Sequence, residues 1–400
     1  MTNHKNTSTN NQKSRKKAEN FIRALADQQT SEIRELSNDI DSSSSEYQDF
    51  LKRVFGEHLQ STTHNQVNCN AANDGLQYLK IFDADSLKEL SNRTTVGREE
   101  RKFYDSLQSI PSQKPLKEAN FSVINNIELL FELYPNAIEL LRYIHDFLHL
   151  RRLAKTDKAI YMPPICISGP PGIGKTAVIK AICKALEVDY EFYDFSSTSS
   201  SWGLIGHDSG WSSSHPGLVL KTLIYGTCGN PILHLDEIDK AMVNHNMDPY
   251  GCLHTLLERP QMYRFVDAYA QNLPLAGQYV MFLATANDVN AIPPTIRSRL
   301  RIIDMQAPSC EEMRKISHNV YRTLLTREDV EESFEENLSD DVVDFLSTKT
   351  PREATLILAR SLASAAARPP KIDRHAISIG DCTNLFSEQN DEQRRIGFVW

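Results

Sequence analysis

Short apolar runs alternate with longer amphipathic stretches through the middle of the chain. Mostly apolar runs bounded by turn residues predict strands, and they lie at 165–168, 190–195, 231–235, 279–284 and 301–304. Between these runs, apolar residues recur at helical spacing, as they do from Val178 to Leu186. Strands separated by helices imply a parallel sheet covered on both faces. The pattern therefore predicts an α/β fold with a parallel sheet for this region.

Helical spacing dominates before this region. Apolar pairs such as Phe21-Ile22 and Phe50-Leu51 predict a mostly helical segment from residue 21 to about residue 110. The stretch from Pro111 to Pro115 is predicted to be a linker. A further helical stretch, from 124 to about 153, then leads to the first strand. The two helical segments therefore flank a predicted break in the chain.

The two ends of the chain differ from its middle. Residues 1–17 are polar and basic, which predicts a disordered tail, with a basic arm that touches nucleic acid or a partner as the alternative. Beyond Pro308 the pattern is helical again, and we expect its acidic run at 328–341 to be a solvated helix face. The apolar tail at 394–400 is expected either to pack on these helices or to dock on a neighbouring molecule.

Composition narrows the classes of protein that fit. The 400 residues suggest about two to three domains. A net charge of −8 argues against a general nucleic-acid binder but leaves room for a local basic patch. The seven cysteines lack metal-binding spacing and suit a reducing cytosol. No apolar run reaches the length of a membrane span, and the polar N-terminus lacks a secretory signal, so we expect a cytoplasmic protein without membrane contact.

The segment after the first strand carries the clearest chemical motif. It fits the pattern G-x-x-x-x-G-K-[ST] with the residues Gly169, Pro170, Pro171, Gly172, Ile173, Gly174, Lys175 and Thr176. Glycines let backbone N–H groups point at phosphates, and the N-terminus of the following helix favours the same charge. Lys175 can reach the β- and γ-phosphates, and the Thr176 hydroxyl can hold Mg²⁺. Strand, glycine-rich loop and helix in this order predict a nucleoside triphosphate site.

Polar residues follow two later strands. Asp236 and Glu237 come directly after an apolar strand, where a carboxylate beside the phosphate loop can hold Mg²⁺. We expect Asp236 to take that role and Glu237 to act as the general base on the attacking water. Asn287 follows the next strand, where an amide would lie near the γ-phosphate and orient the water; a turn residue is the alternative for an isolated asparagine. Together these residues predict a hydrolytic site.

Arginines occur at two further places. Arg297, Arg299 and Arg301 crowd one predicted helix end, either as solvated surface or as a finger that stabilises transition-state charge on a neighbouring subunit's nucleotide. Arg352 begins another predicted helix and could fold back onto bound phosphates. The sequence therefore offers one candidate arginine from the same subunit and a group of candidates for a shared site.

These parts in this order resemble the AAA+ ATPases, and the middle of the chain resembles the ATPase module of Lon-type proteases. The resemblance runs from about Tyr134 to Arg360 and depends on several ordered motifs at family spacing. They are Gly206-His207, Trp211, Pro216-Gly217, Asn230-Pro231, Leu235 to Lys240, Asp248-Pro249, Leu256-Leu257, Phe282 to Asn287, Ile292-Pro293 and Ser298-Arg299.

The resemblance implies a role for each matching residue. Lys175 and Thr176 would bind phosphate and Mg²⁺, with Asp236 as metal ligand and Glu237 as base. Asn287 would be the first nucleotide sensor and Arg352 the second. Arg299 would be the finger that acts on the neighbouring subunit, with Arg297 as the other choice, and Tyr134 lies where the family packs an aromatic residue near the adenine. The cofactors implied are ATP and Mg²⁺, and the active form implied is a homo-oligomeric ring, usually a hexamer.

Two features depart from the Lon pattern. Lon-like rings grip a threaded polypeptide with an aromatic, an aliphatic and a glycine residue in a loop of the central pore. Trp211 occupies the aromatic position here, but Ser212 and Ser213 follow it, which puts processive threading in doubt. Lon-type proteases also continue into a Ser-Lys protease domain, whereas this chain reaches Trp400 soon after Arg352. We therefore expect no peptidase activity.

The patterns along the chain and the resemblance together suggest a division into domains. We expect a disordered basic tail at 1–17 and a helical N-terminal domain at 18–115 that binds a target or partner. An AAA+ α/β ATPase core is expected at 116–307, with a C-terminal helical lid and tail at 308–400. The sequence identifies no target for the segment at 18–115.

Two functions fit these expectations. The first is a Mg²⁺-dependent ATPase ring that remodels or unfolds a protein substrate, or drives a partner effector. The second is an ATP-controlled switch or scaffold that acts on nucleic acid or a partner protein without threading. The basic tail and the serines after Trp211 favour the second, and the full set of predicted catalytic residues favours the first.

Overall fold

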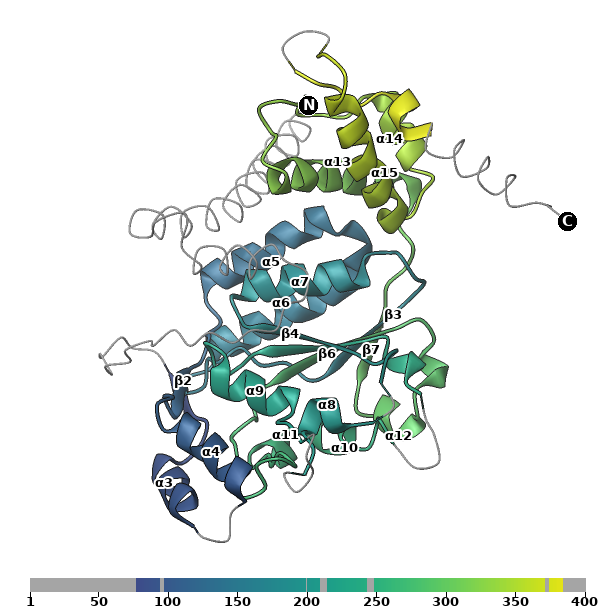
Figure 1. Ribbon diagram of the computed structural model, residues 1–400. Coiled ribbons are helices and arrows are strands. Elements are labelled where there is room, and N and C mark those ends of the chain that lie inside the picture. Colours follow the sequence, from purple (N-terminus) through teal and green to yellow (C-terminus); the bar gives the residue numbers. More distant parts are fainter. Residues whose placement is uncertain are drawn as a thin grey trace, which may run out of the picture.

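The protein consists of an α/β core with a smaller helical domain packed at one end (Figure 1). It is described here from a computed structural model, for residues 77–93, 97–198, 200–208, 214–242, 248–370 and 374–383. The predicted tail at 1–17, most of the predicted N-terminal domain, Trp211 and the apolar tail at 394–400 lie outside these ranges.

A parallel sheet forms the centre of the core and confirms the predicted fold class. Its five strands lie in the order β4-β5-β6-β3-β7, and every neighbouring pair is parallel. Their bounds are β3 Ile165–Ser168, β4 Tyr190–Asp194, β5 Ile232–Asp236, β6 Met281–Ala286 and β7 Arg301–Asp304. Ser168 at the end of β3 pairs with Ala286 and Asp304, so the carboxyl ends of three strands meet at one edge. In α/β proteins, this edge is where ligands bind.

Helices cover both faces of the sheet, as the alternation of strands and helices predicts. On one face lie α5 (Phe121–Leu133), α6 (Ile138–Leu153) and α7 (Lys175–Leu186), and Figure 1 shows them stacked above the strands. The other face carries α8 (Trp202–Ile205), α9 (Leu218–Tyr225), α10 (Leu253–Leu256), α11 (Arg259–Met262) and α12 (Pro294–Arg297). Strand β5 serves both layers, since Ile232 packs in the α5–α7 cluster and Leu233 and Leu235 pack in the other. This alternation is the period-two pattern of a central strand.

The predicted helical stretch at 124–153 is two helices rather than one. Helix α5 ends at Leu133, a single 3₁₀ turn (η1) spans Pro135–Ala137, and α6 follows. Tyr134 has φ −128° and ψ 66°, outside the helical region, because a residue before proline is disfavoured there. After the break, Asn136 donates to the carbonyl oxygen of Ile173, in the loop between β3 and α7, at 3.2 Å.

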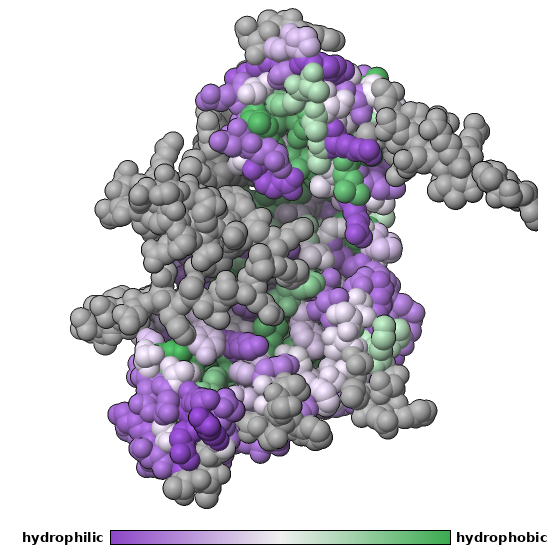
Figure 2. Space-filling view, in the orientation of Figure 1, coloured by the Kyte–Doolittle hydropathy of each residue, from purple (hydrophilic) through white to green (hydrophobic). Residues whose placement is uncertain are grey.

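The described part of the predicted N-terminal domain packs directly on the core. It contains β1 (Tyr78–Lys80), α3 (Ala84–Asn92), α4 (Arg98–Leu107) and β2 (Gln113–Pro115). Leu79, Leu107 and Leu116 share one hydrophobic cluster with Leu233 and Leu235 of the sheet. On the face shown in Figure 2, the outer surface of the α3–α4 pair is largely hydrophilic. The boundary at residue 115 stays a prediction, although a continuous hydrophobic core spans it.

One local expectation for this part is wrong, because the predicted linker at 111–115 contains strand β2, which pairs antiparallel with β1. The described part of the segment before residue 110 is mostly helical, as predicted, apart from β1. Both strands are three residues long, and β2 has the polar sequence Gln-Lys-Pro. Strands this short depend on their partner rather than on an apolar pattern, so their sequences carry little signal.

The helical domain at the C-terminal side consists of α13 (Cys310–Arg327), α14 (Asp340–Leu346) and α15 (Pro351–Ala366), around its own hydrophobic cluster. Capping boxes begin two of these helices, at Ser309 with Glu312 and at Thr350 with Glu353. The acidic run at 328–341 is not a helix face: α13 ends at Arg327, and most of the run connects it to α14. Asp329 adopts a left-handed φ of 54°, which ends the helix. None of the helices in the described ranges is long and apolar enough to cross a bilayer.

A buried carboxylate lies between the two ends of the loop that leads from α8 to α9, and we call this place the neck of the loop. Asp267 is fully buried and accepts hydrogen bonds from the backbone N–H of Gly217 at 3.0 Å and of Tyr269 at 2.9 Å. Gly206 has φ +79°, and a Cβ there would lie 2.1 Å from the Asp267 carboxylate. Burial raises the pKa of Asp267 to about 7, although the two N–H groups and Lys221 favour its charged form. This neck is therefore held by an acid that titrates near neutral pH.

Candidate nucleotide site

The predicted phosphate loop lies between β3 and α7, as strand, loop and helix. Gly169, Gly172 and Gly174 have φ values of +154°, +80° and +100°, which side-chain-bearing residues rarely adopt. A Cβ on Gly169 would lie 2.2 Å from the Met305 carbonyl oxygen, so the loop also needs glycine for its close approach to the chain after β7. Gly174 precedes Lys175, the first residue of α7. The loop therefore brings the N-terminal end of a helix to the carboxyl edge of the sheet.

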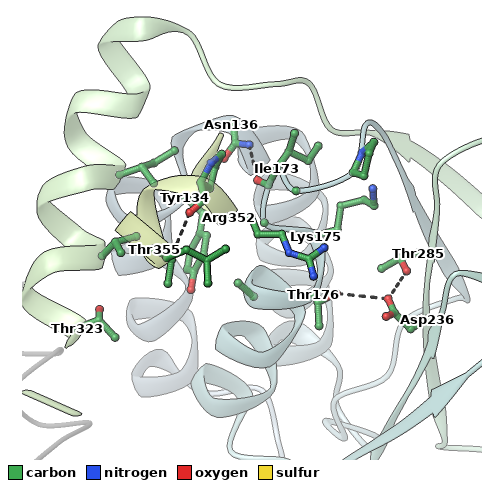
Figure 3. Close-up of a pocket in the computed structure, with 18 of the residues that line it drawn as sticks. Tyr134, Asn136, Ile173, Lys175, Thr176, Asp236, Thr285, Thr323, Arg352 and Thr355 are labelled. Atoms are coloured by element: carbon green, nitrogen blue, oxygen red, sulfur yellow. Dashed lines mark hydrogen bonds between the residues drawn. The ribbon is translucent and has the colours of Figure 1, made fainter. Parts of the chain in front are cut away.

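A cavity of about 830 Å³ opens at this edge, between the core and the helical domain. Residues 171–177 form one wall, and the helical domain contributes α13 and α15 to another. Figure 3 shows side chains from both parts directed into the same space. Cavities of roughly 300–1,000 Å³ hold small-molecule ligands and cofactors. The size and position fit a nucleotide between the two parts.

Lys175 is held at the centre of the site by neutral groups. Its ammonium donates to the carbonyl oxygens of Gly169 at 2.6 Å and Pro170 at 2.8 Å, and to Asn287 Oδ1 at 2.8 Å. Burial lowers the pKa of Lys175, and the carboxylates of Asp239 and Asp236 oppose that effect. The lysine is 8% exposed and makes no carboxylate ion pair within the described residues. Its positive charge is therefore available to an anion in the cavity.

Asp236 ends β5 with one oxygen surrounded by donors. Thr176 Oγ1 donates to Asp236 Oδ1 at 3.3 Å, Thr285 Oγ1 donates to the same oxygen at 2.5 Å, and His234 Nε2 lies 3.2 Å from it. Figure 3 shows the two threonine contacts as dashed lines. Burial raises the pKa of Asp236, but these three partners outweigh it and keep the pKa below its ordinary value. The carboxylate is therefore ionised at neutral pH and suited to a cation.

Glu237 and Asn287 lie beside this carboxylate on neighbouring strand ends. Glu237 adopts a left-handed φ of 50°, its backbone N–H donates to Thr285 Oγ1 at 2.9 Å, and its side chain pairs with Lys240. Asp239 Oδ2 accepts the backbone N–H of Asn287 at 3.0 Å, which fixes the turn after β6. Both predicted residues line the cavity. The structure thus brings the predicted acid pair, the amide and the lysine together.

Arg352 joins the helical domain to the phosphate loop. Its backbone N–H donates to the Gly172 carbonyl oxygen at 3.2 Å, and its side chain lines the cavity. Figure 3 shows Arg352 directed toward the end of the cavity that holds Lys175 and Thr176. The first turn of α15 and the loop therefore touch through backbone as well as side chain.

Tyr134 lines the cavity at a distance from Lys175 and Thr176, as Figure 3 shows. Apolar side chains also line the cavity, and they are those of Leu133, Ile173, Ile316, Val320 and Leu356. Burial raises the pKa of Tyr134 to about 12, so its ring is an apolar wall with a neutral hydroxyl. Asn136 donates to the Ile173 carbonyl oxygen at 3.2 Å and ties this wall to the phosphate loop.

The remaining predicted residues lie elsewhere. Arg299 and Arg297 do not line the cavity. Arg299 Nε lies 2.9 Å from Glu258 Oε1, and Arg297 donates to Asn290 Oδ1 at 3.0 Å. Trp211 lies outside the described residues. If either arginine serves a nucleotide site, it is one outside its own subunit's cavity.

Sequence reasoning missed several residues of the site. Thr285 bridges Asp236 and the Glu237 backbone, Asp239 anchors Asn287, and His234 lies beneath Asp236. Two of these residues could have been found from the alternation of side chains along a strand. Thr285 projects from the same strand face as Asn287, and His234 from the same face as Asp236. The lid side chains of α13 had no comparable signal, because their position depends on how two domains meet.

Comparison with known proteins identifies the core. Residues 165–306 match the family described as "ATPase family associated with various cellular activities (AAA)". These residues form an AAA domain. The match begins at β3 and ends after β7, so the AAA domain includes the phosphate loop and every strand of the parallel sheet.

Similar curated proteins are Lon proteases. The Lon protease of Geobacter metallireducens is 30% identical over 64% of this chain and 30% of its own length. The peroxisomal Lon protease homolog 2 of Caenorhabditis elegans is 33% identical over 44% of this chain and 22% of its own length. The chain thus spans less than a third of either relative. The resemblance to the ATPase region of Lon is confirmed.

A solved structure shares the fold. The S. cerevisiae Hsp104:casein complex in its extended conformation matches with a TM-score of 0.50 and 14% identity, over 62% of this chain and 47% of that chain. At this identity the likeness concerns the fold alone. It agrees with an AAA+ core of parallel strands and helices.

Proposed function

We propose that this protein hydrolyses ATP in a Mg²⁺-dependent reaction within a ring of identical subunits, and that the ring remodels a protein substrate or drives a partner. The observation that carries the proposal is the cavity in which Lys175, Asp236, Asn287 and Arg352 converge on the loop of an AAA domain. When bound, Mg²⁺-ATP would supply the phosphoanhydride bond and a cation that neutralises charge on the phosphate oxygens. The residues described above fit this group in charge, size and donor type.

The phosphate end of the site depends on Lys175 and the loop backbone. The lysine donates hydrogen bonds to two carbonyl oxygens and an amide oxygen, and it can replace these with hydrogen bonds to phosphate oxygens. The glycines hold the loop in a shape that presents N–H groups, and the first turn of α7 adds its dipole. Arg352 would add a second positive charge from the lid.

The metal end depends on Thr176 and Asp236. Oxygen atoms are the preferred ligands of Mg²⁺, and these two side chains already approach within 3.3 Å of each other. Glu237, on the adjacent residue, would accept a proton from the attacking water as general base. Asn287 would hold that water in line while its backbone is fixed by Asp239.

The base end depends on Tyr134 and the apolar residues around it. A purine ring has two flat faces that suit apolar contacts, so it would pack between Tyr134, Ile173 and the α13 residues Ile316 and Val320. Because α13 and α15 belong to the helical domain, closure around the base would move that domain against the core.

The position of Arg299 supports a ring. It lies outside its own cavity and is held by Glu258 on a partly exposed surface, where it could reach a neighbouring subunit. An arginine supplied from a neighbour raises phosphoryl-transfer rates by about 10³–10⁵. Each site would then be complete only in the assembled ring.

Remodelling would need a grip on the target, for which Trp211 is the proposed contact. The rival function, an ATP-controlled switch or scaffold acting on nucleic acid or a partner without threading, remains the second candidate because Ser212 and Ser213 follow Trp211. Trp211→Ala separates the two. A threading ring would lose remodelling and keep its basal ATP turnover, whereas a switch would be unaffected.

The test of the proposed ATPase is turnover measured against protein concentration, with molecular size measured in ATP. The variants are Glu237→Gln and Arg299→Ala, with Arg98→Ala, at an exposed position of α4, as the matched control. We expect turnover per subunit to rise with concentration, the two site variants to be inactive, and Glu237→Gln to accumulate as a ring. Wild-type protein that binds ATP yet neither assembles nor hydrolyses it would refute the motor. Casein that stays intact on a gel during turnover would support the predicted lack of peptidase activity.

A further inference from the structure

A histidine lies directly beneath the proposed metal ligand, in the middle of the central sheet. His234 is fully buried on β5, two residues before Asp236, so both side chains project from the same face of the strand. Its other neighbours on the strand are apolar, and the Phe192 ring contacts it edge-on with centroids 5.3 Å apart. A histidine is an unusual choice for such a position, because burying a polar ring is unfavourable unless its nitrogens are bonded.

Both ring nitrogens of His234 have polar neighbours. Nδ1 lies 2.9 Å from the Tyr190 hydroxyl on β4, and Nε2 lies 3.2 Å from Asp236 Oδ1. The Tyr190 contact is a well-formed hydrogen bond. The Nε2 contact is close but not aligned with the N–H direction, so Nε2 is a buried nitrogen without a full hydrogen bond in this structure. Carboxylate torsions are broad, so a rotation of the Asp236 carboxylate could align the contact.

The partners determine which nitrogen of a neutral ring carries the proton. A neutral imidazole has one donor and one acceptor nitrogen, and an ionised carboxylate can only accept. Nε2 must therefore be the donor toward Asp236, and Nδ1 must accept the proton of the Tyr190 hydroxyl. One hydrogen bond, from Tyr190 to His234, and one close contact, from His234 to Asp236, then point in the same direction across two strands.

We propose that His234 is a positioning residue that orients Asp236 for Mg²⁺. The inference depends on the proposed function, in which Asp236 is a metal ligand. Thr176, Thr285 and His234 all approach Oδ1. Two hydrogen-bond donors and the close Nε2 contact on one oxygen would leave Oδ2 to face a cation, and an aligned Nε2 contact would hold the carboxylate in one plane. Partners that hold a ligand in this way commonly contribute about 10- to 100-fold to metal affinity.

The alternative is that His234 only fills space in the core. Two substitutions separate these roles. His234→Leu keeps an apolar side chain of similar bulk and removes the donor, whereas His234→Gln keeps an N–H donor at about the place of Nε2. A space-filling role predicts that leucine is tolerated best, and a positioning role predicts that glutamine is.

The experiment measures Mg²⁺ dependence of nucleotide binding rather than turnover. In the Glu237→Gln background, binding of a fluorescent ATP analogue is titrated with Mg²⁺ and repeated in EDTA. We expect His234→Leu to raise the half-saturating Mg²⁺ concentration about tenfold or more, with unchanged binding in EDTA, and His234→Gln to restore most of it. Equal Mg²⁺ dependence in all three proteins would overturn the proposal, while absence of any Mg²⁺-stimulated binding in the background protein would instead refute the proposed function.

A second measurement covers the case in which His234→Leu fails to fold. Nitrogen-15 NMR of the nucleotide-free protein, with the signal assigned by its loss in His234→Gln, reports which ring nitrogen carries the proton. We expect the proton on Nε2, with a changed Nδ1 signal in Tyr190→Phe and a smaller rise in the Mg²⁺ requirement of that variant. A proton on Nδ1 of a neutral ring would overturn the proposal, because Nε2 could then not donate to Asp236.

Discussion

The buried carboxylate at the neck of the α8–α9 loop makes the stability of the protein depend on pH in a predictable direction. The pKa of Asp267 is about 7 in the folded protein, against an ordinary value of 3.8. Because this pKa is higher in the folded state, the folded protein binds a proton at Asp267 more tightly than the unfolded chain does. The stabilisation that this proton gives is fully present below about pH 3.8 and is lost as the pH rises through about 7.

The size of the effect follows from the two pKa values. At 1.36 kcal/mol for each pH unit, deprotonation of Asp267 costs the folded state about 2–3 kcal/mol between pH 5 and pH 8. For a unit of 150–250 residues, 1 kcal/mol corresponds to about 2–4 °C in Tm. The contribution of Asp267 to the fall in Tm over this range is therefore roughly 5–10 °C.

The assay compares wild type with Asp267→Asn by thermal unfolding across this range. The substitution loses one acceptor, so one of the N–H groups of Gly217 and Tyr269 loses its partner, at a pH-independent cost of about 1–3 kcal/mol. We therefore expect Asp267→Asn to be the less stable protein at pH 5 and to approach or pass wild type at pH 8. Asp105→Asn, at an exposed position on α4, should keep the wild-type slope. Parallel curves for wild type and Asp267→Asn would refute the reasoning.

Two further substitutions test the phosphate loop and the arginine outside the cavity. Gly174→Ala is expected to lower stability by about 1–2 kcal/mol through its left-handed φ alone, because an added Cβ meets no atom within 4 Å. Gly380→Ala, where φ is not positive, is the control, and equal Tm values for the two variants would contradict the argument. Glu258→Gln is expected to lower ATP turnover by up to about fivefold, since partly exposed ion pairs contribute about 0–1 kcal/mol. It should leave nucleotide affinity unchanged, and weaker binding at low protein concentration would show that Glu258 acts within its own site.

Much of the core could be predicted from the sequence, because its signals are local. Strand β3 and the loop up to Thr176 combine a buried apolar run, glycines with positive φ and a helix start, and each leaves its mark on adjacent residues. The carboxylates Asp236 and Glu237 follow from the same logic, because parallel strands end at one edge of the sheet. The split at Pro135 was also encoded locally, in the restriction that proline imposes on Tyr134.

The parts that sequence reasoning missed depend on contacts between distant segments. Strands β1 and β2 exist because they pair with each other and pack on the core, not because their three-residue sequences favour extended backbone. Thr285 reaches Asp236 only when β6 lies beside β5, and His234 gains its Tyr190 partner only when β4 lies beside β5. The acidic run after Arg327 has helical composition, but the left-handed Asp329 ends the helix.

The backbone hydrogen bond between Arg352 and Gly172 has a thermodynamic consequence for the coupling between the helical domain and nucleotide binding. Through this bond, the orientation of the helical domain relative to the core depends on the conformation of the loop that would hold the phosphates. Binding free energies are reciprocal, so whatever factor nucleotide contributes to docking of the helical domain, docking contributes to nucleotide affinity. A force that pulls the helical domain away from the core would thus weaken nucleotide binding, so this contact would make nucleotide affinity sensitive to mechanical load.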